Sequence, residues 1–200
     1  MKLFFSPTSP YVRKVMACAI TRGLEQRVEK VATNPNLSPP ELLACNPLSK
    51  VPCLVTDDGV ALFDSPVICE YLDSIDDALA LFPAHGAARW RALKLQAMAD
   101  GILDASVPRR GELLKTPDEG RVAWIARQKA AVDRTLDMLE NDPPHRMVDI
   151  GSITVACALG YLDFRFAAEN WREGHPRLAH WHAGFDRRPS VVANLPIDDS

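Results

Sequence analysis

The stretch NPLSKVPCL, residues 46–54, places Pro52 directly ahead of an apolar run. Proline has no N–H for a strand ladder and occurs at a strand's first position or at a bend, so the backbone of Val51 is diverted from the sheet here. The N–H and C=O of Val51 are then available to a ligand that carries its own peptide groups, as in strand addition. The Val51–Pro52 bond is a candidate for the cis form, which the local sequence alone does not decide.

The segments around this stretch alternate between strand and helix patterns. Before it, the sequence predicts strands at 2–5 and 27–32 on either side of a helix at 10–22 that Gly23 ends. After a short helix at 39–45, it predicts strands at 52–56 and 60–63, joined by the turn Asp57-Asp58-Gly59. A helix then begins with Ser65 as N-cap and Pro66 at the first helical position. The predicted order is βαβ followed by ββα.

Strand patterns stop after about residue 80. The sequence predicts helices at 87–106, 119–140, 150–168 and 176–187, and Arg188-Pro189-Ser190 ends the last of them before an irregular tail. The apolar face of the 87–106 helix is predicted from the spacing of Trp90, Leu93, Ala97, Met98, Gly101 and Ile102. Pro83 and Gly86 favour a linker at 79–86, which divides the chain into domains at 1–78 and 87–200.

The composition argues for a soluble protein with a small-molecule or protein partner. A net charge of −3 and a pI near 5.9 give no electrostatic reason to expect nucleic acid or an anionic membrane. No apolar run approaches the roughly 20 residues of a membrane span, and no targeting segment precedes the first strand, so we expect a cytoplasmic location. The odd number of cysteines and the absence of C-x-x-C predict a reducing compartment, without a disulfide framework or a zinc site.

The histidines at 175, 180 and 182 invite a metal interpretation. Ligand pairs on a helix need a spacing of three or four, and positions 180 and 182 do not share a face. We therefore expect no metal.

Two further stretches are suited to anion binding at helix starts. In FDSPVICEYL, residues 63–72, the hydroxyl of Ser65 and the N–H groups of an open first turn offer a carboxylate site, and Asp64 could receive an ammonium group. The alternative is that these residues simply start a helix. In SPTSPYVRKV, residues 6–15, Ser9 stands where an N-cap belongs and Pro10 fits the first helical position.

Together these features resemble the cytosolic glutathione S-transferases. The shared features are the element order with a proline before the third strand, NPLSKVP and DSPVICEYL at this spacing, the helical second half, and the late elements ACALGYLDFR and RRPS. The N-terminus looks most like bacterial members with the motif T-S-P-[FY]-V-R-K. The resemblance implies an α/β thioredoxin-like N-terminal domain with a mixed sheet, followed by an all-α helical bundle. It also implies a homodimer, with the 87–106 helix as part of the interface.

The resemblance also assigns residues to glutathione, the co-substrate of the family. By position, Pro52 is cis, Val51 pairs its backbone with the cysteinyl unit, and Asp64 and Ser65 hold the γ-glutamyl end. Lys50 matches a position near the glycyl carboxylate, although a solvated lysine is the alternative.

The resemblance makes Ser9 the candidate catalytic residue. A free thiol titrates near pH 8.5, so only a few per cent of glutathione is the nucleophilic thiolate at neutral pH. We expect Ser9 to donate a hydrogen bond to that sulfur, with Ser6 and Thr8 as rivals, Tyr11 as a weaker one, and a purely structural N-cap as the alternative. A serine cannot form the mixed disulfide that a cysteine there could form. Conjugation to a small, apolar electrophile is therefore favoured, with peroxidase or isomerase chemistry, or non-catalytic ligand carriage, as alternatives.

The electrophile is expected between the domains. Its candidate pocket residues are Tyr11, Met98, Ile102, Ala105, Pro108, Arg109 and Tyr161. The alternatives are that Met98, Ile102 and Ala105 belong to the core and that Arg109 is solvated. Cys53 could supply redox chemistry, but its place in an apolar strand favours the core.

The stretch VDIGSITVACALGYLDF resembles the N-capping box of a buried helix in this family. Here Asp149 can accept from the N–H of Ser152, but Ser152 is a poorer return partner than a carboxylate, so the second bond of the box is not expected to be secure.

Overall fold

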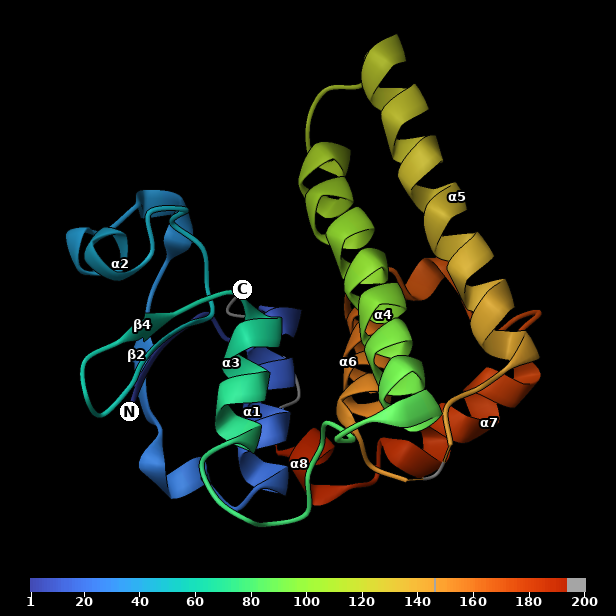
Figure 1. Ribbon diagram of the computed structural model, residues 1–200. Coiled ribbons are helices and arrows are strands. Elements are labelled where there is room, and N and C mark those ends of the chain that lie inside the picture. Colours follow the sequence, from blue (N-terminus) through green and yellow to red (C-terminus); the bar gives the residue numbers. More distant parts are fainter. Residues whose placement is uncertain (146, 194–200) are drawn as a thin grey trace. The chain divides into compact units, whose positions relative to one another are not determined.

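The computed structural model describes residues 1–145 and 147–193 and separates into two compact units (Figure 1). The first unit is Met1–Ala84 together with the segment that begins at Arg188, and the second is His85–Arg187. The assignment of residues 79–86 as a linker stays a prediction.

The first unit is built on a mixed sheet of four strands. β1 (Lys2–Phe5), β2 (Glu29–Ala32), β3 (Cys53–Val55) and β4 (Ala61–Leu62) lie in the order β2-β1-β3-β4. β1 pairs in parallel with β2 and antiparallel with β3, and β3 pairs antiparallel with β4. The βαβ-ββα order with a mixed, thioredoxin-like sheet is confirmed.

Helices lie on both faces of this sheet. Alternation along a strand sends neighbouring side chains to opposite faces, and Phe4 and Cys53, which are register partners, pack with Leu42 of α2 (Pro40–Cys45) in one buried cluster. Leu3 and Leu54, also partners, are fully buried on the other face. There α1 (Pro10–Thr21) and α3 (Ser65–Asp73) lie side by side (Figure 1). Short 3-10 turns, η1 (Glu25–Arg27) and η2 (Pro35–Leu37), complete the connections.

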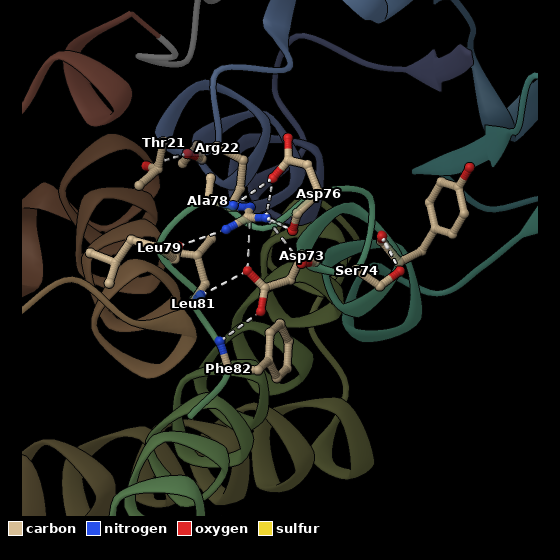
Figure 2. Close-up of polar contacts among 11 residues, drawn as sticks. Thr21, Arg22, Asp73, Ser74, Asp76, Ala78, Leu79, Leu81 and Phe82 are labelled. Carbon is tan, nitrogen blue, oxygen red and sulfur yellow. Dashed lines mark hydrogen bonds and ion pairs between the residues drawn. The ribbon is translucent and has the colours of Figure 1, made fainter. Parts of the chain in front are cut away.

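Arg22, at the end of α1, binds the segment that follows α3 through hydrogen bonds and an ion pair (Figure 2). The buried guanidinium donates to the carbonyl oxygens of Leu79, at 2.7 Å, and Asp76, at 2.8 Å. Its Nε lies 3.5 Å from the carboxylate of Asp73, which in turn accepts from the backbone N–H groups of Leu81 and Phe82 at 2.7 and 2.9 Å. A stretch without helix or strand is thereby held by charge-assisted hydrogen bonds.

The second unit is helical. It contains α4 (Gly86–Leu113), α5 (Glu119–Asn141), α6 (Ile150–Arg165), the 3-10 turn η3 (Ala167–Glu169) and α7 (Pro176–Phe185). α6 is buried along nearly its whole length and packs on α4. The two helices approach so closely that a Cβ at Gly151 would lie 2.6 Å from the carbonyl oxygen of Ala92 and 2.7 Å from Cβ of Leu95. The all-α second half is confirmed.

Some details of the helices differ from the sequence predictions. α4 continues past Pro108 to Leu113, because its buried side chains, Ser106 and Arg109 among them, hold the helix where one backbone N–H is missing. The predicted apolar face was wrong in part, since Trp90 is 69% exposed and Leu95 and Ala99 are buried instead. After α7, the residues Pro189–Val192 form a short helix, α8, that packs on α1, where an irregular tail was predicted. Residues 194–200 lie outside the described part of the chain.

The capping box of α6 is complete. The carboxylate of Asp149 accepts from the N–H of Ser152 at 2.7 Å, and the hydroxyl of Ser152 accepts from the N–H of Asp149 at 2.9 Å. The expectation of an insecure second bond was therefore wrong, because a serine hydroxyl reaches the N-cap amide without the length of a glutamate.

Candidate functional site

The strand register brings three predicted site segments to one end of the sheet. Phe4 is opposite Cys53 and Leu54 is opposite Leu62. Both pairings are antiparallel, so three chain segments lie at the same end of the sheet. They are the segment that leaves β1 (Ser6–Ser9), the segment that enters β3 (Val51–Pro52) and the segment that leaves β4 (Phe63–Ser65). The candidate residues of the first unit therefore share one end of one sheet.

Ser9 is the N-cap of α1, as predicted. Its backbone is extended, its Oγ accepts from the backbone N–H of Val12 at 3.3 Å, and Pro10 follows as the first helical residue. A hydroxyl has one proton to donate besides its two acceptor sites. With the Val12 N–H on an acceptor site, the Ser9 hydroxyl can still donate to a ligand atom at the positive end of the helix dipole.

The two alternative candidate hydroxyls, those of Ser6 and Thr8, form a hydrogen bond with each other. Ser6 Oγ and Thr8 Oγ1 lie 3.4 Å apart, and the carbonyl oxygen of Ser6 accepts from the N–H of Ser9 at 3.1 Å. Ser6, Thr8 and Ser9 are all half-buried. Tyr11, in the first turn of α1, is half-buried as well.

The Val51–Pro52 peptide bond is cis, as the family resemblance implied. Asn46, which the sequence analysis did not single out, shapes the loop before it. The buried Asn46 side chain donates to the carbonyl oxygen of Lys50 at 2.9 Å and accepts from the N–H of Leu48 at 3.0 Å. The signal in the sequence was the dipeptide Asn46-Pro47, which is typical of turns.

The neighbouring residues of this loop are fixed in the same way. Ser49 has a left-handed backbone (φ 50) and donates its hydroxyl to the carbonyl oxygen of Pro35 at 2.9 Å. The side chain of Lys50 is exposed, whereas Val51 packs against the cluster of Phe4, Leu42 and Cys53. The loop thus presents a cation to solvent beside a positioned backbone.

At the start of α3 the sequence prediction was off by one residue. Asp64, not Ser65, is the N-cap; it makes no side-chain hydrogen bond to the helix start, and Ser65 is the first helical residue with Pro66 after it. The reason is that Asp64 has the extended backbone that an N-cap requires (φ −88, ψ −159). Asp64 is exposed and Ser65 is only 1% exposed. The first-turn N–H groups, which have no partner within a helix, lie beside both.

Cys53 is a core residue. It is 0% exposed, and burial, with a smaller effect from the nearby thiol of Cys45, raises its pKa from 9.0 to about 11. At neutral pH the Cys53 thiol is protonated, so it does not supply a ready nucleophile.

The predicted pocket residues of the second unit lie on α4 and α6. Ile102, Ala105, Arg109 and Tyr161 are buried, Met98 is half-buried and Pro108 is exposed. The alternative that Arg109 is solvated is wrong, because it is 1% exposed and donates to Glu169 at 2.5 Å. The Arg109 guanidinium also stacks 4.0 Å from the centre of the Phe166 ring, which Tyr161 meets edge-on at 6.4 Å.

A separate cavity of about 400 Å³ lies between the end of α4 and the start of α5. It is lined by Pro108, Glu112, Asp118, Gly120, Arg121 and Trp124. Of the predicted pocket residues it includes Pro108. Arg121 donates to Glu112 at 2.8 Å and to Asp118 at 2.6 Å, so its charge is already paired with carboxylates of the same cavity.

Two of the three clustered histidines, His175 and His182, have structural partners. His175 lies 2.5 Å from the carbonyl oxygen of Trp171, and the buried His182 ring meets the Trp171 ring edge-on. Burial lowers the pKa of His182. Within residues 1–145 and 147–193, no three His, Cys, Asp or Glu side chains gather in an arrangement that could hold a metal ion.

Comparison with known families covers both halves of the chain. Residues 8–75 match the glutathione S-transferase N-terminal domain, and residues 122–184 match the glutathione S-transferase C-terminal domain. The chain belongs to the glutathione S-transferase family.

Relatives of similar length occur in several bacteria. The chain is 36% identical over 201 residues to the uncharacterized GST-like protein YibF of Escherichia coli (strain K12), covering 98% of each. A glutathione transferase family member from Pseudomonas fluorescens Pf-5 is 43% identical. Its structure with bound glutathione covers 98% of this chain and 99% of its own, with a TM-score of 0.92. The structure of that member with bound S-(propanoic acid)-glutathione covers 99% and 100%, with a TM-score of 0.89. A glutathione S-transferase from Methylobacillus flagellatus KT with glutathione bound is 33% identical over 98% of this chain and 99% of its own, with a TM-score of 0.88.

The sequence predicted no membrane span in this chain. Among the helices in the described part of the chain, none combines the length and the apolar character needed to cross a membrane.

Proposed function

We propose that this protein is a glutathione transferase in which the Ser9 hydroxyl donates a hydrogen bond to the sulfur of bound glutathione. The observation that carries the proposal is the position of Ser9 as N-cap of α1, in a chain of the glutathione S-transferase family. The hydroxyl keeps a proton to donate, and it stands at the positive end of a helix of 12 residues.

The energy required is within reach of such a site. Lowering the thiol pKa by two units takes about 2.7 kcal/mol of preferential stabilisation of the thiolate. A hydrogen bond to a charged group contributes about 1.5–3 kcal/mol, and a helix N-terminus adds about 0.3–1 kcal/mol. One hydroxyl at one helix start is therefore sufficient to ionise much of the bound thiol at neutral pH. No basic side chain is required to deprotonate Ser9, because Ser9 acts as a donor and not as a nucleophile.

The other groups of glutathione are proposed to lie at the same end of the sheet as Ser9. The backbone of Val51, turned by the cis bond to Pro52, pairs with the cysteinyl unit. Asp64 receives the α-ammonium group of the γ-glutamyl end, and Ser65 with the first-turn N–H groups of α3 receives its carboxylate. The exposed Lys50 attracts the glycyl carboxylate. The glutathione-bound relatives at 43% and 33% identity support this assignment.

The reaction we favour is conjugation of the thiolate with a small electrophile. In support, the Pseudomonas fluorescens relative binds S-(propanoic acid)-glutathione, which is a glutathione substituted at sulfur. Tyr11, Met98, Ile102, Ala105, Arg109 and Tyr161 remain the proposed electrophile residues, although Arg109 already holds Glu169. A homodimer and a cytoplasmic location also remain proposals.

The test is a comparison of wild type with Ser9→Ala. Turnover is measured with glutathione and a panel of aryl halides, epoxides and α,β-unsaturated carbonyl compounds, and glutathione affinity by calorimetry. We expect kcat to fall about 10- to 100-fold with affinity nearly unchanged, as for a loss of about 1.5–3 kcal/mol of thiolate stabilisation. Unchanged kcat contradicts the role of Ser9. Tight binding without turnover in the wild type indicates carriage instead, and turnover only with hydroperoxides or isomerisable substrates indicates peroxidase or isomerase chemistry.

A further inference from the structure

Two cysteines that are eight positions apart in the sequence belong to one cluster in the fold. Leu42 and Cys45 are three residues apart on α2 and so share a face of that helix. This face packs on β3, where Leu42, Phe4 and Cys53 form the buried cluster, and Cys45 packs against the same cluster. A spacing of eight residues does not by itself indicate such a pairing.

The two thiols differ in access to solvent. Among the five cysteines, all of which lie in the described part of the chain, Cys45 alone is partly exposed. Cys53 is fully buried behind it, and the charge of a Cys45 thiolate contributes to the raised pKa of Cys53, as expected for neighbouring sulfur atoms. Cys18, Cys69 and Cys157 are buried in α1, α3 and α6, in positions that a reagent in solution does not reach.

We propose that Cys45 exchanges with low-molecular-weight disulfides such as glutathione disulfide, and that Cys53 then resolves the mixed disulfide to give a Cys45–Cys53 disulfide. In the first step the Cys45 thiolate attacks one sulfur of the external disulfide, whose S–S bond breaks and releases one thiolate, which takes up a proton. In the second step the Cys53 thiolate, its proton lost to solvent, attacks Sγ of Cys45 and releases the second thiol. The protein loses two hydrogen atoms, and the external disulfide is reduced to two thiols.

The order of the steps follows from burial. Cys45 reacts first because it is the accessible thiol. Cys53 reacts second because its thiol is protonated at neutral pH and is therefore a poor nucleophile. Below a pKa of about 11, the thiolate fraction of Cys53 rises about tenfold with each pH unit. The mixed disulfide should therefore accumulate at pH 7 and be resolved faster at pH 9.

The disulfide would act on the loop described above. Cys45 is followed by Asn46, whose side chain donates a hydrogen bond to the carbonyl oxygen of Lys50. Val51 packs against the same cluster as the two cysteines. A disulfide holds its two Cα atoms roughly 4.4–6.8 Å apart, and a Cys45–Cys53 bond would join the last residue of α2 covalently to the first residue of β3. The segment 46–51 lies between the two cysteines, so the bond would restrict its conformations, and we expect the oxidised protein to bind glutathione about 3- to 30-fold more weakly.

The experiment uses the full chain, reduced and freed of reductant, with hydroxyethyl disulfide and, separately, glutathione disulfide. Intact mass is followed with time at pH 7 and pH 9. Wild type should gain one adduct and then convert to a species that lacks two hydrogens, and peptide mapping should join Cys45 to Cys53. Cys53→Ala should stop at the adduct, Cys45→Ser should not react at either step, and Cys69→Ser should behave as wild type.

The outcomes separate this proposal from the proposed function. Hydroxyethyl disulfide has no peptide groups, so its exchange with Cys45 does not depend on the glutathione site. An adduct that persists in Cys45→Ser, or a wild type in which mapping finds no Cys45–Cys53 link at pH 9, overturns the proposal. Because mapping is done on wild type, a Cys53→Ala variant that fails to fold does not remove the test.

Discussion

The hydroxyl oxygen of Ser9 lies 3.3 Å from the backbone nitrogen of Val12 and accepts its N–H. This bond makes Ser9 the N-cap of α1 and holds its side chain over the open first turn. The same contact that starts the helix therefore positions the hydroxyl for a ligand at the helix end. A structural N-cap and a thiolate donor are compatible roles of one side chain, because the first uses an acceptor site of the oxygen and the second uses its proton.

Removing the charge of Lys50 should weaken glutathione binding without affecting turnover. Lys50→Met is expected to raise the Kd about 1.4- to 5-fold at low salt, since an exposed ion pair contributes about 0.2–1 kcal/mol, and the effect should shrink as ionic strength rises. Lys94→Met, an exposed lysine on α4, is the matched control. Calorimetry at two salt concentrations measures both. Equal Kd values for Lys50→Met and wild type would show that Lys50 is merely solvated.

The capping box of α6 should stabilise the second unit through both of its bonds. Asp149→Ala removes the acceptor of the Ser152 N–H and is expected to lower the free energy of unfolding by about 0.5–2 kcal/mol. Ser152→Ala removes the return bond and should cost a smaller amount. Glu173→Ala, at an exposed position, is the control. Denaturant unfolding of the three variants provides the comparison, and a midpoint for Asp149→Ala equal to that of Glu173→Ala counts against the box.

The contact between α4 and α6 should not tolerate a side chain at Gly151. A methyl group there would meet the carbonyl oxygen of Ala92 at 2.6 Å, so Gly151→Ala should destabilise the protein by about 1–3 kcal/mol through overpacking. Gly184 lies in α7, and a Cβ added there would have nothing within 4 Å. Gly184→Ala should therefore be neutral or slightly stabilising, because alanine is the better helix former. The melting temperatures of the two variants are compared with that of the wild type. Similar changes in melting temperature for both variants would contradict the close approach of α4 and α6.

The buried thiol of Cys53 should make stability depend on pH in the alkaline range. Below pH 9.0 the thiol is protonated in both the folded and the unfolded chain, and its contribution is fully present. Between pH 9.0 and about 11 the unfolded chain loses the proton while the folded chain keeps it, so the free energy of unfolding falls by about 1–3 kcal/mol. The free energy of unfolding of the Cys53→Ala variant should fall less than that of the wild type over this pH range. Unfolding curves at several pH values measure the slope, and equal slopes in both proteins would refute this cause.

The element order could be predicted from the sequence because its signals are local. Turn residues such as Gly59, prolines at helix starts and the apolar spacing of the strands each depend on a few neighbouring residues. The position of Ser9 as an N-cap was predictable for the same reason. At α3 the local signal was ambiguous by one residue, since Asp64 and Ser65 are both good N-caps and only the backbone conformation selects Asp64.

Features that depend on distant residues were not predictable in this way. Arg109 was predicted as a pocket residue with a solvated side chain as the alternative, and its burial depends on Glu169 and Phe166, about sixty positions away. The helix α8 packs on α1, at the other end of the sequence. The role of Asn46 required knowing that the carbonyl of Lys50 turns back toward it. Each of these contacts is created by tertiary packing, which a periodicity within one segment does not encode.

The acidity of the bound thiol is measured most directly by titrating it through its ultraviolet thiolate absorbance in the glutathione complex. Wild type and Ser9→Ala are saturated with glutathione and compared with free glutathione over the same pH range. We expect the wild type to lower the thiol pKa by about one to two units from its free value near 8.5, and Ser9→Ala to return most of that shift. A bound thiol no more acidic than the free one, or an equal shift in Ser9→Ala, would contradict the role proposed for Ser9.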